Sequence, residues 1–144
     1  MIRHRSGDSL VLFSIKSSSS DTELAFSGPR KDYFTVELKG NEVGVIRQVY
    51  AYSPHSPSLG AFFLRISHHN RPWASTERWE SLEGEFNLSA TCSSLGEVTF
   101  SLVMHSRLDV ADGWRIVATL TADLGQLPGI GAAAEQFFGF LDCT

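Results

Sequence analysis

Trp79-Glu80-Ser81-Leu82-Glu83-Gly84 opens the stretch that decides the fold, which continues to Leu120. Three runs that alternate apolar and polar residues follow this opening. The positions expected to face a core are Phe86, Leu88, Ala90 and Cys92, then Val98, Phe100, Leu102 and Met104, then Trp114, Ile116, Ala118 and Leu120. A period of two held through three segments predicts a half-buried antiparallel meander, with Glu85 and the polar residues of the runs facing solvent.

The rest of the chain supplies more strands and two amphipathic helices. We expect strands at 10–15, 22–26, 33–39 and 43–52, the last with a bulge near 44–46, and a flexible serine loop at 17–20. A helix should begin at Ser56-Pro57 and present Leu59, Phe62, Phe63 and Ile66 on one face, followed by a connector at 73–78. A second helix should begin near Gly125 and present Leu127, Ile130, Ala134, Phe137 and Leu141.

These elements predict an α+β fold in the order ββββ-α-βββ-α. We expect a mainly antiparallel sheet of six or seven strands with two helices packed on one face, because each strand has one apolar face to cover. Residues 1–144 form a single domain in this prediction, with residues 1–9 as a loose N-terminal segment. A weak internal echo of strand, strand and helix, with Pro57-x-Leu59-Gly-Ala and Pro128-x-Ile130-Gly-Ala at the two helix starts, is either a duplication or a chance similarity.

Composition limits the classes of function. The chain has 42% hydrophobic residues, ten of them phenylalanines, and a net charge of −4, so it offers no basic field for nucleic acid or an anionic membrane. Its apolar runs are too short to cross a bilayer. Cys92 and Cys143 stand outside any C-x-x-C pair, which favours two reduced thiols in a cytoplasmic protein over a disulfide.

The candidate binding site lies around the connector that leads into the meander. Arg71, Trp73, Arg78 and Trp79 combine residue types that are frequent at binding hot spots. Glu80 and Glu83, with Glu85, add an acidic cluster beside them. A solvated face or a core position for the tryptophans would explain the same residues without any binding function.

No motif in the sequence predicts catalysis, a metal or a cofactor. His68 and His69 are adjacent, so on a helix their rings would point about 100° apart and would not share one ion. Gly125-x-x-x-Gly129-x-Gly131 lacks the Lys-Ser/Thr ending of a phosphate loop, and close packing of the helix start on the sheet explains its glycines better. We therefore predict no catalytic residue, no metal ligand and no cofactor, and the sequence leaves open whether the protein is an enzyme.

The chain resembles an uncharacterised family of small bacterial proteins, a domain of unknown function. The resemblance rests on Arg71-Pro72-Trp73, on the opening Trp79–Gly84, on Gly96-x-Val98, on Trp114 and on Leu124-Gly125-Gln126-Leu127. It covers roughly residues 33 to 140. The resemblance implies no established activity.

Three functional hypotheses remain from the sequence. The first is a non-catalytic protein-binding module, of immunity or accessory type, that uses an exposed sheet face or the connector between Trp73 and Glu85. The alternative is a small-ligand-binding protein or enzyme with a pocket between sheet and helices. The third is an oligomer that pairs through an edge strand such as 10–15.

Overall fold

The computed structural model describes residues 12–52, 58–107, 109 and 111–142. The first half of the chain contains strands β1 (Leu12–Lys16), β2 (Glu23–Ser27), β3 (Tyr33–Lys39) and β4 (Gly44–Tyr50), then helix α2 (Leu59–Ser67). The second half contains β5 (Glu77–Glu80), β6 (Phe86–Cys92), β7 (Glu97–His105) and β8 (Arg115–Asp123), a 3₁₀ turn η1 (Leu124–Gln126) and helix α3 (Leu127–Asp142). The fold is α+β and its sheets are antiparallel, as predicted.

The strands form two sheets, and the prediction of one six- or seven-stranded sheet is wrong. One sheet has the order β1-β2-β3-β4 and the other the order β5-β6-β7-β8, and every strand pairs only with its neighbours in the chain. Strand β5 is one strand more than the seven expected, and it overlaps the stretch 73–78 that was expected to be a connector. Alternation of apolar residues shows which side chains share a face but not which strands pair, so the pattern could not separate one sheet from two.

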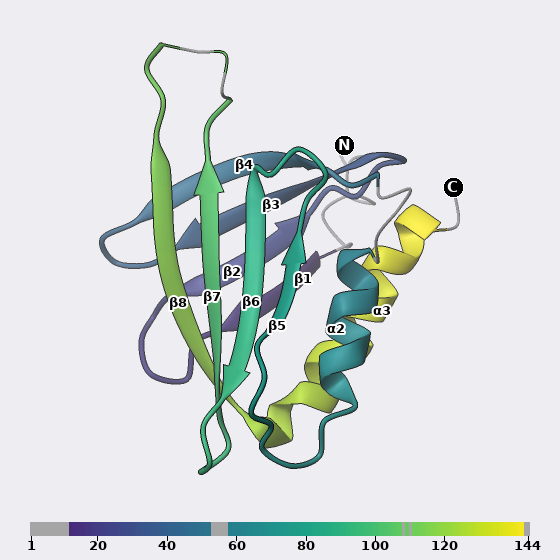
Figure 1. Ribbon diagram of the computed structural model, residues 1–144. Helices are drawn as coiled ribbons and strands as arrows, with labels where there is room; N and C mark the ends of the chain where they lie inside the picture. The colour runs from purple at the N-terminus through teal and green to yellow at the C-terminus, as the bar shows by residue number, and fades with distance from the viewer. Residues whose placement is uncertain (1–11, 53–57, 108, 110, 143–144) are drawn as a thin grey trace, which may run out of the picture.

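The two sheets lie face to face with their strands crossing at a large angle, and both helices lie at one side of this pair (Figure 1). Phe26 of the first sheet meets Phe86 of the second, with ring centroids 6.1 Å apart. Helix α2 contacts both sheets, because its Phe63 ring packs against Phe26 of the first sheet and Phe100 of the second. The helices therefore complete the core between the sheets, and they do not cover one face of a single sheet as predicted.

Helices α2 and α3 pack against each other, α2 also contacts β5, and α3 also contacts β1. A Cβ atom on Gly60, near the start of α2, would lie 2.9 Å from the Cβ of Phe138, near the end of α3. A Cβ atom on Gly131, near the start of α3, would overlap the side chain of Ser67 at the end of α2. The two helices are thus antiparallel, and the glycines of the internal echo allow their close approach. Gly131 packs against the other helix and not against the sheet.

Helix α2 begins at Leu59, two residues after the predicted first helical residue Pro57. Ser58 is its N-cap, because its hydroxyl oxygen accepts a hydrogen bond from the Ala61 N–H at 3.1 Å. The predicted start at Ser56-Pro57 lies outside the described residues. The apolar stripe is confirmed, since Leu59, Phe62, Phe63 and Ile66 are all buried.

Three other local predictions are wrong. The β3–β4 register runs without interruption from Tyr33↔Tyr50 to Lys39↔Gly44, so this ladder has no bulge. Trp114, which was expected to face the core, is 40% exposed and precedes the first residue of β8. Glu85, predicted to face solvent, is only 2% exposed.

The serine loop is tied to the other sheet, although its composition predicted flexibility. The Ser18 N–H donates to the carbonyl oxygen of Thr121 on β8 at 2.9 Å. The Thr121 N–H donates in return to the Ser17 hydroxyl oxygen at 3.1 Å, and the hydroxyls of Ser19 and Thr121 lie 2.8 Å apart. These hydrogen bonds join the β1–β2 loop to the outer strand of the second sheet.

Candidate functional site

The six residues of the predicted site lie on different surfaces. Strand β5 alternates, so Trp79 points inward and is 7% exposed, with its ring 6.0 Å from that of Phe86. Arg78 and Glu80 point to the opposite, outer side of the sheet and are exposed. Trp79 therefore has a structural position in the core, and only its two neighbours are available to a partner.

Arg78 and Glu80 border a shallow groove on the outer face of the β5–β8 sheet, which we call the outer groove. It has a volume of about 420 Å³. The other outward-facing residues that line it are Asn87, Ser89, Ser101, Val103 and Val117. The sheet register places Glu80, Asn87, Val103 and Val117 in one row across the four strands.

The floor of the outer groove contains an unsatisfied acceptor. The side-chain Oδ1 of Asn87 is shielded from solvent and accepts no hydrogen bond from any described residue. Such a group costs free energy when it stays unpaired. Val103 lies next to Asn87 in the same row, and Val117, on the far side of Val103, is 59% exposed. The groove thus offers an apolar wall and one acceptor to a ligand that carries an N–H or O–H group.

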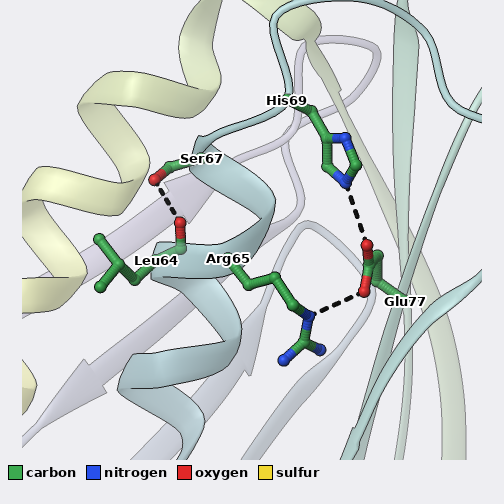
Figure 2. Close-up of polar contacts among 5 residues, drawn as sticks. All are labelled: Leu64, Arg65, Ser67, His69 and Glu77. Carbon is green, nitrogen blue, oxygen red and sulfur yellow. Dashed lines mark hydrogen bonds and ion pairs between the residues drawn. The ribbon is translucent and has the colours of Figure 1, made fainter.

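Trp73 lies in a separate cluster over the connector between α2 and β5. Its ring stacks on that of His69, with centroids 4.1 Å apart. His69 Nε2 lies 3.0 Å from Oε2 of Glu77, and Arg65 Nε donates to the other carboxylate oxygen at 2.9 Å (Figure 2). The hydrogen bond from His69, followed by that from Arg65, lowers the pKa of Glu77 below its ordinary value. This cluster fixes the connector on the sheet, and Arg71 is exposed beside it.

Glu83 and Glu85 lie at a third place, where the two sheets meet. The turn that carries them contains Gly84 at a φ of +76°, a conformation that favours glycine. The buried Glu85 carboxylate accepts from the Ser81 hydroxyl at 2.5 Å and from the Tyr50 N–H at 3.0 Å. Glu83 is exposed and lines a polar cleft of about 420 Å³ together with Glu85 and with Arg47, His105, Ser106, Arg107 and Asp109.

Glu85 has a structural task that alternation could not reveal. Tyr50 lies on β4, an outer strand of the first sheet, and its N–H points away from β3 toward the Glu85 carboxylate. On the same strand, Arg47 Nη1 donates to the carbonyl oxygen of Gln48 at 2.6 Å, and its Nε donates to the carbonyl oxygen of His105 at 2.9 Å. These side chains satisfy the Tyr50 N–H and the Gln48 carbonyl oxygen at the free edge of β4, and they join this strand to the second sheet.

The described residues contain no group of three or more His, Cys, Asp or Glu side chains placed to hold a metal ion. His68 is the C-cap residue of α2, and His69 is engaged with Glu77. Within the described part of the chain, no helix is long and apolar enough to span a membrane.

The comparison with protein families gives a single result. Residues 15–140 match the model of a family of unknown function, DUF6228. The chain belongs to this family. The DUF6228 match extends from within β1 to within α3, so it includes both sheets and both helices. No curated protein and no solved structure matches the chain.

Sequence reasoning did not find the outer groove, although one signal was present. Val103 and Val117 are apolar residues at outward-facing positions of β7 and β8, where the rest of the face is mainly polar. An apolar residue on the solvent side of an amphipathic strand interrupts the pattern. Two such interruptions in register mark the place where the groove lies.

Proposed function

We propose that this DUF6228 protein is a non-catalytic protein-binding module, of accessory or immunity type, and that its contact surface is the outer face of the β5–β8 sheet. The observation that carries the proposal is the shielded Asn87 Oδ1 without a hydrogen-bond donor, on the floor of a groove bounded by Val117. A partner could place an N–H group over Asn87 and an apolar side chain on Val103 and Val117. It would then remove the free-energy cost of the unpaired Asn87 Oδ1 and cover the exposed apolar surface.

The charges at the border of the groove suit a protein surface. Arg78 and Glu80 lie two residues apart on β5, and neither forms an ion pair with another described residue. Charged groups at the rim of an interface mainly set its specificity and its rate of association. Of the six residues predicted from the sequence, these two are the ones that we retain as contacts, while Arg71, Trp73 and Glu83 lie on other surfaces.

The alternative, a ligand pocket between sheet and helices, has less support. The space between the two sheets and the helices is filled by phenylalanine rings in mutual contact. Phe13, Phe26, Phe34, Phe62, Phe63, Phe86, Phe100, Phe137 and Phe138 are all buried there. A solid core of this kind favours recognition at the outer surface.

Capture of partners from the native host tests the proposal. Val103→Lys places a charge in the centre of the outer groove, and we expect it to remove the partners that the wild-type protein retains, with unchanged circular dichroism. Leu95→Lys is the matched control, because Leu95 is an exposed apolar residue in the β6–β7 turn and does not line the outer groove. Retention of every partner by the Val103→Lys variant would show that the outer groove is not the contact surface.

A further inference from the structure

The outer edge of β8 contains a run of backbone groups that have no hydrogen-bond partner among the described residues. Thr121 directs both its N–H and its carbonyl oxygen away from β7, toward Ser17 and Ser18. Backbone groups of alternate residues in a strand point to the same side, so Arg115, Val117 and Thr119 direct theirs to this edge as well. No described residue hydrogen-bonds to these groups from that side. We call residues 115–119 the open edge.

The other three outer strands differ from β8 in this respect. The free side of β4 is blocked at Tyr50, whose N–H donates to the Glu85 carboxylate, and at Gln48, whose carbonyl oxygen accepts from Arg47. The outer strands β5 and β1 contact helices α2 and α3. Uncovered edges tend to pair with other chains, and proteins commonly block them. Among the described residues, the serine loop blocks β8 only at Thr121, which leaves residues 115–119 without a described segment along their edge.

A cleft beside the open edge would receive a side chain of an added strand. Its volume is about 440 Å³, and it is lined by Gly44, Val45 and Ile46 of β4 and by Trp114, Arg115 and Ile116. Figure 1 shows the β3–β4 hairpin reaching past β8 on the inner side of the second sheet. A strand added to β8 would therefore have this hairpin behind it and the outer groove in front.

We propose that an extended segment of the partner protein pairs with the open edge of β8 as a fifth strand of the β5–β8 sheet. Its inward side chains are apolar, because the cleft is lined largely by apolar groups of Val45, Ile46 and Ile116. Its outward face carries an acidic residue opposite Arg115, which is exposed and forms no ion pair with any described residue. Strand addition of this kind obtains affinity from main-chain hydrogen bonds and specificity from alternate side chains.

This inference rests on the proposed function and specifies how the partner docks. A peptide titration followed by NMR tests it, with the acetylated and amidated peptide Thr-Val-Asp-Val-Thr-Val-Thr as the probe. We expect shifts of the Arg115, Val117 and Thr119 amide signals and slower hydrogen exchange at these three residues. A peptide that is N-methylated at alternate residues lacks the N–H donors for β8. Its affinity should be lower by at least about tenfold.

Two variants separate edge pairing from other modes of binding. Thr119→Pro removes an outward N–H without removing a hydrogen bond to β7 and leaves the residues that line the outer groove unchanged, and we expect it to weaken binding of the peptide about tenfold. Arg115→Glu should reverse the charge preference, so that a peptide with lysine in place of aspartate binds better than the original. Leu95→Lys places a charge in the exposed β6–β7 turn, away from the cleft and from the open edge, and we expect it to leave the affinity for the peptide unchanged.

Several outcomes would overturn the inference. Absence of shifts at the open edge, or equal binding of the N-methylated peptide, would exclude strand pairing. Light scattering that shows a dimer lost in the Thr119→Pro variant would assign the edge to a second copy of this chain. If host partners are lost with Val103→Lys but kept with Thr119→Pro, the outer groove is the contact and the edge is not. If both variants keep them, the proposed function itself fails.

Discussion

At the scale of single residues, Glu85 shows how a charged side chain can serve the architecture. Its carboxylate is buried between two sheets and accepts hydrogen bonds from Ser81 and from the backbone of Tyr50. A glutamate that follows a glycine turn and precedes a strand is expected to be solvated. It is buried because the edge of the first sheet passes directly behind the β5–β6 turn and requires an acceptor there.

Glu85→Ala should lower the free energy of unfolding by about 2–3 kcal/mol, because it leaves the Tyr50 N–H and the Ser81 hydroxyl without their acceptor in a buried place. Glu85→Gln keeps one acceptor oxygen and should cost less. Urea denaturation measures both. Glu83→Ala is the control, since this carboxylate is two residues away and exposed; an equal loss from Glu83→Ala would contradict the structural role of Glu85.

The ion-paired Glu77 predicts a dependence of stability on pH. Its pKa is lowered in the folded protein by His69 and Arg65, so its stabilising contribution is present above the ordinary carboxyl pKa of 4.5 and is lost as the pH falls through the lower folded-state value. Glu77→Gln should flatten this acid limb, by an amount on the order of 0.5–1 kcal/mol because the pair is partly exposed. Denaturation at a series of pH values checks this, with the exposed Glu80→Gln as the control that should keep the wild-type slope.

At the scale of elements, helices α2 and α3 approach closely because glycines stand where the two helices meet. Gly60 faces Phe138 and Gly131 faces Ser67, so each helix start approaches the end of the other. The sequence predicted both helices and their apolar stripes from the spacing of leucine, isoleucine and phenylalanine. It could not predict that the helices pack on each other, because an apolar stripe does not specify which element it packs against.

Gly131→Ala should destabilise the protein by about 1–3 kcal/mol, since the added methyl group overlaps the Ser67 side chain. The steric cost of the methyl group must exceed the gain of about 1 kcal/mol that alanine brings to a helix interior, so the net effect is still a loss of stability. Thermal denaturation measures it. Gly129→Ala is the matched control, with open space around the new methyl group, and Ser67→Gly should restore much of the stability lost in Gly131→Ala. A neutral Gly131→Ala variant would mean that the helices are not in close contact.

At the scale of the whole molecule, each half of the chain is a four-stranded meander followed by a helix. The faces of these strands could be predicted from the alternation, and Phe86, Leu88, Phe100 and Leu102 are buried as expected. The division into two sheets could not, because it depends on contacts between distant segments. The candidate site was predicted in part: Arg78 and Glu80 border the outer groove, whereas Trp79 belongs to the core. Asn87, Val103 and Val117 form one surface only through the sheet register.

The serine loop has a consequence for the order of folding. Ser17 and Thr121 are 104 positions apart in the chain, so their contact closes a very long loop. The hydrogen bond stabilises the protein by less than the conformational entropy that this closure costs. It should therefore form late, after both meanders exist. Ser17→Ala should accelerate unfolding in stopped-flow experiments and leave the refolding rate nearly unchanged. The Ser17 hydroxyl, which joins the two halves, would then slow unfolding and take no part in the folding nucleus.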